Sequence, residues 1–123
     1  MPILDVEMVL RPGEQLEPGL AQVLAGRARE ALGAPAGTTW VKVHALAAEQ
    51  YAEDGGGPEG VYPVFVSVLK ARWVKPAARQ EEVARLTRAV AAACGRPAEN
   101  VHLFYEPEGA GRVAFGGRLV PEA

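Results

Sequence analysis

The chain has 123 residues with a formal net charge of −2 at pH 7, and this length allows one hydrophobic core, so we expect one domain over residues 1–123. The near-neutral charge argues against nucleic acid or an anionic membrane surface as a partner. The single cysteine, Cys94, excludes an intrachain disulfide and favours a reducing compartment.

The first half of the chain predicts a strand, a helix and a second strand. Residues 3–10 alternate apolar and acidic side chains, which is typical of a strand. Residues 18–32 predict a helix, because Pro18 suits a first turn and apolar residues recur at helical spacing. That stripe consists of Leu20, Val23, Leu24, Ala28 and Ala31. Gly33 and Pro35 end the helix, and residues 40–46 predict the next strand.

The second half predicts the same elements in the same order. Residues 61–69 predict a strand, Pro76 opens a helix, and Gly95-Arg96-Pro97 ends it. The expected buried stripe of this helix is Val83, Leu86, Val90 and Ala93. Residues 100–105 predict a further strand, and Gly116-Gly117 in the tail, residues 112–120, indicates a short strand that bends.

The residues that end the helices and begin the strands recur at the same spacing in the two halves. Gly33 and Gly95 have the same sequence separation as Pro35 and Pro97, and Pro2 and Val64 are equally far apart. We interpret the chain as a duplicated βαβ unit, with residues 2–53 and 61–123 as the units and the Gly-rich residues 54–60 as the linker. Right-handed crossovers then give an α+β two-layer sandwich, in which two helices cover one face of a four-stranded mixed sheet.

The second face of this sheet is expected to be apolar as well. Residues on one parity of the strands, such as Leu4 and Val66, face the helices, but the other parity also carries large side chains, namely Ile3, Val9, Phe65 and Leu69. Two helices can cover only one face. We therefore expect copies of the chain to pack sheet against sheet.

Three stretches resemble the tautomerase superfamily. MPILDVEMV is similar to its Met-Pro start on a strand, VHLFYEPEGAGRVAFGGRLVP is similar to the dehalogenase branch, and KVHALAAEQYAEDG is closer to the muconate isomerase branch. The resemblance covers nearly the whole chain and implies a long-form fused subunit of a homotrimer. It also implies an N-terminal proline in an apolar pocket ringed by arginines, with no metal or organic cofactor.

Pro2 is the catalytic residue that this resemblance implies. After removal of Met1 its secondary amine can accept a proton, and burial and nearby cations lower the pKa of such an amine. A base poised near neutral pH can move a proton within a small unsaturated keto or enol acid, which is tautomerase or isomerase chemistry. The alternative is that Pro2 only begins an edge strand, where its missing N–H is harmless.

Cationic side chains are needed to bind a substrate carboxylate. The candidates are Arg72, Lys42, Arg11 and Arg112, with Lys70 and Lys75 as further cations, although each one can equally be a solvated surface charge. The arginine positions of the dehalogenase branch align with Ala71 and Val74, one step or more from Arg72. Phe104, Val113 and Phe115 stand where that branch has its tyrosine and acid, which argues against water activation and predicts an apolar pocket wall.

No other constellation in the sequence indicates a site. His44, His102 and Cys94 lack metal-ligand spacing. The N-terminal stretch has no basic region or long apolar run, and so we expect a cytoplasmic protein. Two alternatives to a tautomerase stay open: a non-catalytic trimeric protein that binds small acids or a partner, and a proline-dependent decarboxylase of a 3-oxo acid.

Overall fold

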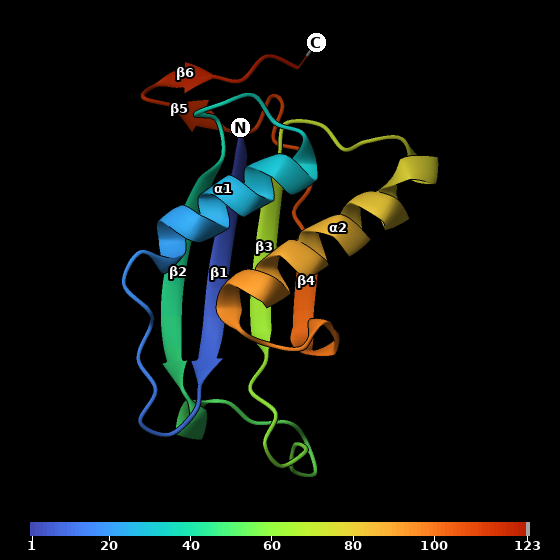
Figure 1. Ribbon diagram of the computed structural model, residues 1–123. Coiled ribbons are helices and arrows are strands. Elements are labelled where there is room, and N and C mark those ends of the chain that lie inside the picture. The colour runs from blue at the N-terminus through green and yellow to red at the C-terminus, as the bar shows by residue number, and fades with distance from the viewer. Residues whose placement is uncertain (123) are drawn as a thin grey trace.

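The computed structural model describes residues 1–122. Residues 1–122 form six strands, two α-helices and two short 3₁₀ turns, and Figure 1 shows both helices on the same face of the main sheet. In chain order they are β1 (Pro2–Leu10), α1 (Leu20–Leu32), β2 (Trp40–Ala47), η1 (Ala48–Gln50), β3 (Val64–Lys70), α2 (Pro76–Cys94), η2 (Ala98–Asn100), β4 (Val101–Tyr105), β5 (Ala114–Phe115) and β6 (Arg118–Leu119).

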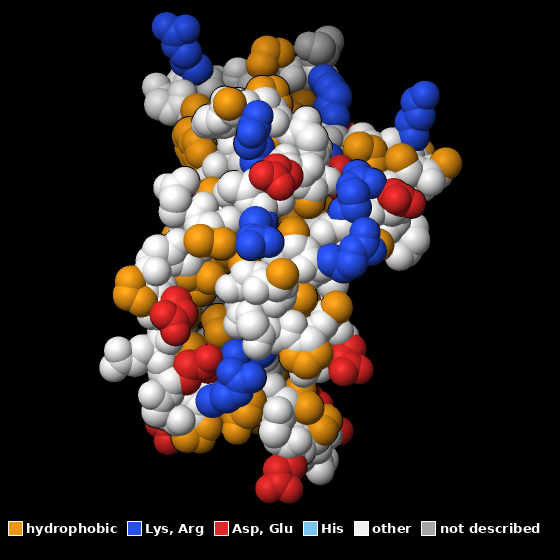
Figure 2. Space-filling view, viewed as in Figure 1, with side chains coloured by type: hydrophobic (Ala, Val, Ile, Leu, Met, Phe, Trp, Pro, Cys, Tyr) orange, Lys and Arg blue, Asp and Glu red, His pale blue; other side chains and the backbone are white. Residues whose placement is uncertain are grey.

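The main sheet confirms the duplicated architecture. Its strand order is β2-β1-β3-β4, with β1 parallel to β2 and β3 parallel to β4. The two βαβ units meet where β1 pairs antiparallel with β3, so that the sheet is mixed as predicted. The helix-covered face carries arginines and carboxylates over α1 and α2 (Figure 2). Within residues 1–122, neither helix is long and apolar enough to cross a membrane.

The hydrophobic core lies between the helices and one face of the sheet. The side chains that alternate along β1 and β3 toward the helices are fully buried, as are those of the inner helix faces. The core includes Leu4, Val6, Val64, Val66, Val68, Leu24, Leu86 and Val90. Cys94 is also buried, and burial raises the pKa of its thiol to about 11.

Both helices end where the glycines predict, at Gly33 and Gly95. Each glycine has a left-handed backbone, with φ of 63° and 64°, which costs little without a Cβ. The predicted start of the first helix at Pro18 is wrong, because Gly19 has φ of 82°, outside the helical region, and α1 begins at Leu20. β3 begins at Val64, three residues later than predicted. The residue before it is Pro63, which has no N–H to donate to the hydrogen bonds of the sheet.

The predicted buried stripes are correct only in part. Val23 is 46% exposed and does not belong to the inner face of α1. In α2 the fully buried position is Glu82, not Val83, which is only half-buried. The predicted bending strand in the tail is instead a tight hairpin, because Gly116 and Gly117 both have positive φ and turn β5 back on β6.

The sheet face opposite the helices, here called the open face, differs from the apolar surface that was predicted. Ile3, Phe65 and Leu69 do lie on it, but polar and charged side chains alternate with them in the pairing register. Those residues are Asp5, Glu7, Lys42, His44 and Ser67. The open face is therefore a mixed surface.

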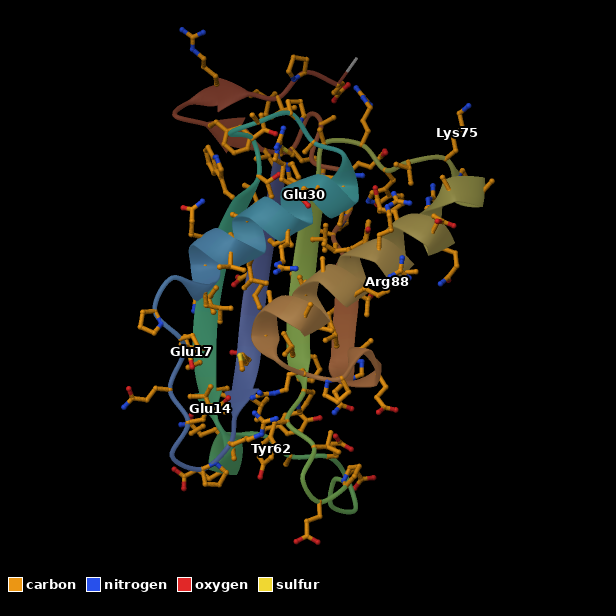
Figure 3. All side chains as sticks on the ribbon, viewed as in Figure 1. Glu14, Glu17, Glu30, Tyr62, Lys75 and Arg88 are labelled. Carbon is orange, nitrogen blue, oxygen red and sulfur yellow. The ribbon has the colours of Figure 1, made fainter. Side chains whose placement is uncertain are left out.

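A buried arginine joins the chain segments at the end of the sheet opposite the N-terminus. Arg96, 6% exposed, donates to the carbonyls of Tyr62 and Val9, each at 2.9 Å, and to Glu14 Oε1 at 2.8 Å. Figure 3 shows Glu14 and Tyr62 at this end. The hydrogen bond from Arg96 is the main reason that the pKa of Glu14 falls from its ordinary value of 4.5 to about 2.

We expect Glu14→Gln to lower the free energy of unfolding at pH 7 by about 2 kcal/mol. Since the pKa of Glu14 is lower in the folded than in the unfolded chain, its stabilisation is complete above about pH 4.5 and is lost as the pH falls toward 2. Urea unfolding should therefore show the difference in unfolding free energy between wild type and variant closing from about pH 4.5 to about pH 2. Glu17→Gln, in the same loop but exposed, is the control, and a gap that is constant with pH would contradict the assignment.

Candidate functional site

Pro2 is the first residue of β1 and is buried. It lies opposite Lys70, the last residue of β3, in the antiparallel pairing of the two strands. This end of the sheet is also where the β5–β6 hairpin lies, close to the N-terminus in Figure 1. Pro2 therefore lies beside the last residue of β3, at the end of the sheet that the C-terminal segment also reaches.

The Met1 side chain fills an apolar space beside Pro2. A Cβ placed on Gly109 would be 2.5 Å from Met1 Cε, 3.1 Å from Val113 Cγ2 and 3.4 Å from Leu69 Cδ1, so the Met1 methyl group, Val113 and Leu69 all lie around Gly109. Met1 also lines a pocket of about 210 Å³ together with Gly37, Thr38, Trp40 and Phe115. We call this 210 Å³ pocket the Met1 pocket.

The walls of the Met1 pocket come from segments far apart in the sequence. Trp40 begins β2 and meets Phe115 of β5 edge to face, with ring centroids 5.2 Å apart. The Gly109 N–H donates to the Lys70 carbonyl at 2.8 Å, which continues the pairing of β3 into the C-terminal segment. The predicted wall residues Val113 and Phe115 are thus placed beside Met1, next to Pro2.

Three of the predicted cations lie at this end of the sheet: Lys70, the strand partner of Pro2, and the two arginines Arg72 and Arg112. The Ala110 N–H donates to the Ala71 carbonyl at 3.2 Å, so the backbone of Arg72 lies close to the segment that carries Arg112. Both arginines are exposed. The Arg112 guanidinium donates to the carbonyls of Glu108 and Pro107, at 3.0 and 3.2 Å, which orders it along its own loop.

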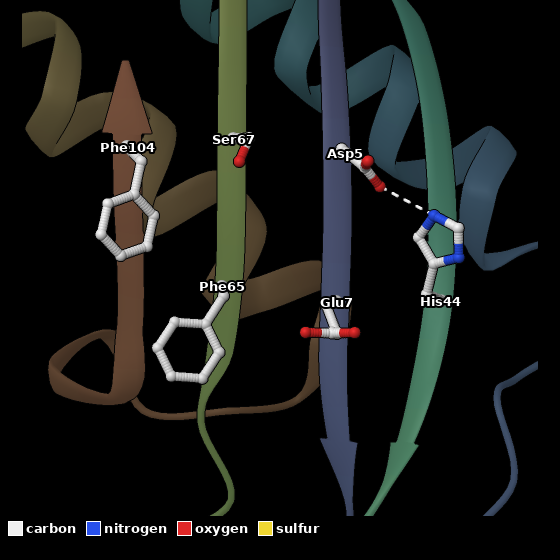
Figure 4. A pocket seen from close by; sticks show the side chains of 6 residues that line it. All are labelled: Asp5, Glu7, His44, Phe65, Ser67 and Phe104. Atoms are coloured by element: carbon white, nitrogen blue, oxygen red, sulfur yellow. Dashed lines mark ion pairs between the residues drawn. The ribbon is translucent and has the colours of Figure 1, made fainter. Parts of the chain in front are cut away.

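The other predicted residues lie elsewhere in the chain. Arg11 is at the far end of β1, where it forms an ion pair with Glu14 at 3.2 Å. Lys42 is on the open face, with its Nζ 3.7 Å from Asp5 Oδ2. Phe104 is on β4 and 54% exposed on the open face (Figure 4). Lys75 precedes α2 and points outward (Figure 3). Within one chain, the structure does not bring these four residues to Pro2.

Sequence reasoning missed a buried polar network close to Pro2. Lys70 Nζ lies 2.7 Å from Glu82 Oε1, and the Tyr105 hydroxyl donates to Glu82 Oε2 at 2.7 Å. Burial, followed by the bond to Glu82, raises the pKa of Tyr105. The available signal was the spacing of Glu82, Leu86 and Val90, which puts a carboxylate on the inner face of the helix.

A buried hydroxyl without a partner lies on the other side of Pro2. Ile3 pairs with Trp40 in the parallel register of β1 and β2, so that Thr39 comes next to Pro2. Thr39 Oγ1 is inaccessible to solvent and has no hydrogen-bond partner among the described residues. A buried hydroxyl normally has one, and in the Met1-bearing chain the Pro2 nitrogen is an amide that has no hydrogen to donate.

The open face also carries a broad pocket, of about 430 Å³, shown in Figure 4. His44 Nε2 lies 2.8 Å from Asp5 Oδ1, and Glu7, Phe65, Ser67 and Phe104 complete the lining. No group of three His, Cys, Asp or Glu side chains within residues 1–122 is arranged to hold a metal ion. The pocket is wide and exposed, whereas Pro2 lies at an enclosed end of the sheet.

Comparisons with known proteins identify the fold. No family model matches the chain, and no curated protein sequence matches it either. Among solved structures, a fused 4-OT that forms a symmetric trimer has a TM-score of 0.75 at 17% identity, with 96% of this chain and 94% of that chain covered.

Two further structures of similar size have the same fold. The macrophage migration inhibitory factor from Trichinella spiralis has a TM-score of 0.69 at 14% identity, with 95% of this chain and 98% of that chain covered. FG41 malonate semialdehyde decarboxylase inhibited by 3-bromopropiolate has a TM-score of 0.68 at 15% identity, with coverages of 93% and 88%. The predicted resemblance to the tautomerase superfamily is thus confirmed for the fold.

Proposed function

We propose that the protein is a cofactor-independent tautomerase whose general base is the amine of Pro2, freed by removal of Met1. Its substrate is a small unsaturated keto or enol acid with a carboxylate. The base takes a proton from the carbon next to the carbonyl and returns it to another carbon of the conjugated system, so that the double bond moves and no atom is gained or lost.

The observation that carries this proposal is the position of the Met1 side chain. Its methyl group lies close to Gly109, around which Val113 and Leu69 also lie, and Met1 is bonded directly to Pro2. Removal of Met1 would have two effects at once, because it would convert the Pro2 nitrogen from an amide to a secondary amine and would empty the space next to it. The vacated space is apolar, and an apolar environment favours the neutral form of an amine.

The surroundings of Pro2 also suit a carboxylate substrate. Arg72 and Arg112 are on adjoining segments near the end of β3. Guanidinium groups bind carboxylates in a bidentate manner and stabilise the enolate that forms when a proton is lost. Lys42 and Arg11 are distant from Pro2 within the chain, and we propose that they reach the site of a neighbouring subunit.

A decarboxylase of a 3-oxo acid is the second candidate. The specific observation in its favour is the likeness to malonate semialdehyde decarboxylase across nearly the whole chain. A protonated Pro2 amine would hydrogen-bond the 3-oxo group, so that the electron pair left by the departing carbon dioxide is stabilised as an enolate. Release of carbon dioxide from a 3-oxo acid, compared with ketonisation of an enol acid, distinguishes the two candidates.

The proposal predicts that Pro2→Ala lowers kcat/KM for ketonisation of phenylenolpyruvate or 2-hydroxymuconate by about a hundredfold or more, the usual contribution of a general base. Alanine still presents a terminal amine after processing, but a primary one of different shape. The assay is run on protein whose mass shows the loss of Met1. Unchanged turnover in the variant would exclude Pro2 as the base. Retention of Met1 in the native protein would favour the non-catalytic alternative.

Arg72 and Arg112 are expected to contribute to the binding of substrates with a carboxylate and not to that of neutral substrates. Arg72→Ala and Arg112→Ala should each lower kcat/KM for a carboxylate substrate roughly tenfold to a hundredfold, since a charge-assisted hydrogen bond contributes about 1.5–3 kcal/mol. Lys42→Ala tests whether a neighbouring subunit supplies a cation. Lys75→Ala is the matched control. Equal losses with a carboxylate substrate and with its neutral ester would show that these residues are structural.

We also propose that the protein is a homotrimer in which the open faces meet around an axis. Two observations support this. The fused 4-OT of the same fold is a symmetric trimer, and the large apolar side chains Trp40, Phe104 and Leu119 are 52%, 54% and 60% exposed in the single chain. Exposed apolar surface of this kind favours association.

Sedimentation velocity at micromolar concentration is expected to show a trimer. Leu119→Asp, in the exposed hairpin, should weaken the trimer because a carboxylate is costly to bury between subunits, while the unfolding transition of the monomer changes little. Arg118→Ala, on the same strand, is the control. A wild-type protein that sediments as a monomer would contradict the proposal.

A further inference from the structure

Lys70 is the charged residue closest to Pro2 along the sheet. The two residues are partners in the antiparallel register of β1 and β3, where side chains of partners lie on the same face. That face is the one covered by the helices, since Val66 and Val68 on the same parity are fully buried. Accordingly the Lys70 side chain is only 13% exposed.

The Lys70 ammonium is held in place from the side away from Pro2. Glu82, whose side chain is 2% exposed, accepts from Lys70 Nζ through one carboxylate oxygen and from the Tyr105 hydroxyl through the other, both at 2.7 Å. Tyr105 is on β4 and Pro2 is on β1, on opposite sides of β3. Of the three residues Lys70, Glu82 and Tyr105, Lys70 is therefore the one on the strand next to Pro2, and its ammonium is the charge that faces Pro2.

The fold alone does not explain the presence of this ion pair. Removal of two charges from water is costly, and replacement of a buried ion pair by apolar side chains of similar volume is often neutral or stabilising. The pair borders a hydrophobic core, and Lys70 stands at the strand position that pairs with Pro2.

We propose that Lys70, fixed by Glu82, is a positioning residue whose positive charge keeps the free amine of Pro2 neutral near pH 7. This inference rests on the proposed function of Pro2 and explains how that base is kept ready. A second positive charge nearby disfavours protonation of an amine, and the effect is strong where solvent is excluded. Glu82 fixes the ammonium, and Tyr105 fixes Glu82.

The other charged groups around Pro2 act more weakly, because they are exposed or paired. Arg72 and Arg112 are exposed in the loops that follow β3 and β4, as are Glu106 and Glu108. The Glu108 carboxylate accepts from the Trp73 backbone N–H. Asp5 is on the opposite face of the sheet, paired with His44. Arg85 on α2 is bound to the Ala31 carbonyl and to Glu81, and Arg29 and Glu30 at the end of α1 are exposed.

The direct test is a titration of the Pro2 amine by ¹⁵N NMR in processed protein labelled with ¹⁵N-proline. The main variant is the double substitution Lys70→Met with Glu82→Gln, which removes both charges and keeps the volume, because Lys70→Met alone leaves the Glu82 carboxylate buried without a cation. We expect the pKa of Pro2 to rise by about one unit in the double variant. The acid limb of kcat/KM should shift by the same amount.

Two control variants separate this role from a structural one. Tyr105→Phe keeps both charges and removes only the hydrogen bond that holds Glu82, so the Pro2 pKa should change by less than in the double variant. Lys75→Met removes an exposed lysine at the start of α2 and should leave the Pro2 pKa unchanged. A Pro2 pKa that is the same in the double variant and the wild type would overturn the inference. If the NMR shift is found and no tautomerase activity is, the electrostatic role stands and the proposed reaction fails.

Discussion

The antiparallel pairing of β1 with β3 is the contact on which the other features of the molecule depend. Each βαβ unit forms its own parallel pair, and the two units become one sheet only through this register. The same register puts Pro2 opposite Lys70, whose carbonyl accepts from Gly109 and so directs the C-terminal segment over the start of β1. A shift of one residue would turn Pro2 to the other face and separate it from Lys70 and Glu82.

The sequence predicted the architecture well because its signals were local. Gly33, Gly95 and Pro76 mark helix ends through backbone geometry that does not depend on the rest of the fold. The errors arise from long-range contacts. The burial of Glu82 depends on Lys70 and Tyr105 from two other strands, and the burial of Arg96 depends on Glu14, 82 residues away. No periodicity within a segment reports such partners.

The candidate site was predicted only in part. Pro2, Val113 and Phe115 were identified from a family resemblance, and the fold brings their segments together. Arg72 and Arg112 lie close to that end because backbone hydrogen bonds continue β3 into residues 109 and 110. The polar residues of the open face were visible in the sequence at Asp5 and Glu7, but the prediction of an apolar face rested on Ile3, Val9, Phe65 and Leu69.

The Arg96 cluster shows what duplication permits. Val64 is the counterpart of Pro2 in the second unit, but it follows Pro63 inside the chain and has no terminal amine to offer. The end of the sheet near Val64 is held by the Arg96 guanidinium, which donates to Tyr62, Val9 and Glu14. In the first unit, Ala34 occupies the sequence position that corresponds to Arg96 and has no side chain that could make these contacts. The buried ion pair at the Pro2 end is instead Lys70 with Glu82. Fusion of two like units thus lets each end of the sheet carry its own buried charges, a difference that two identical separate chains cannot have.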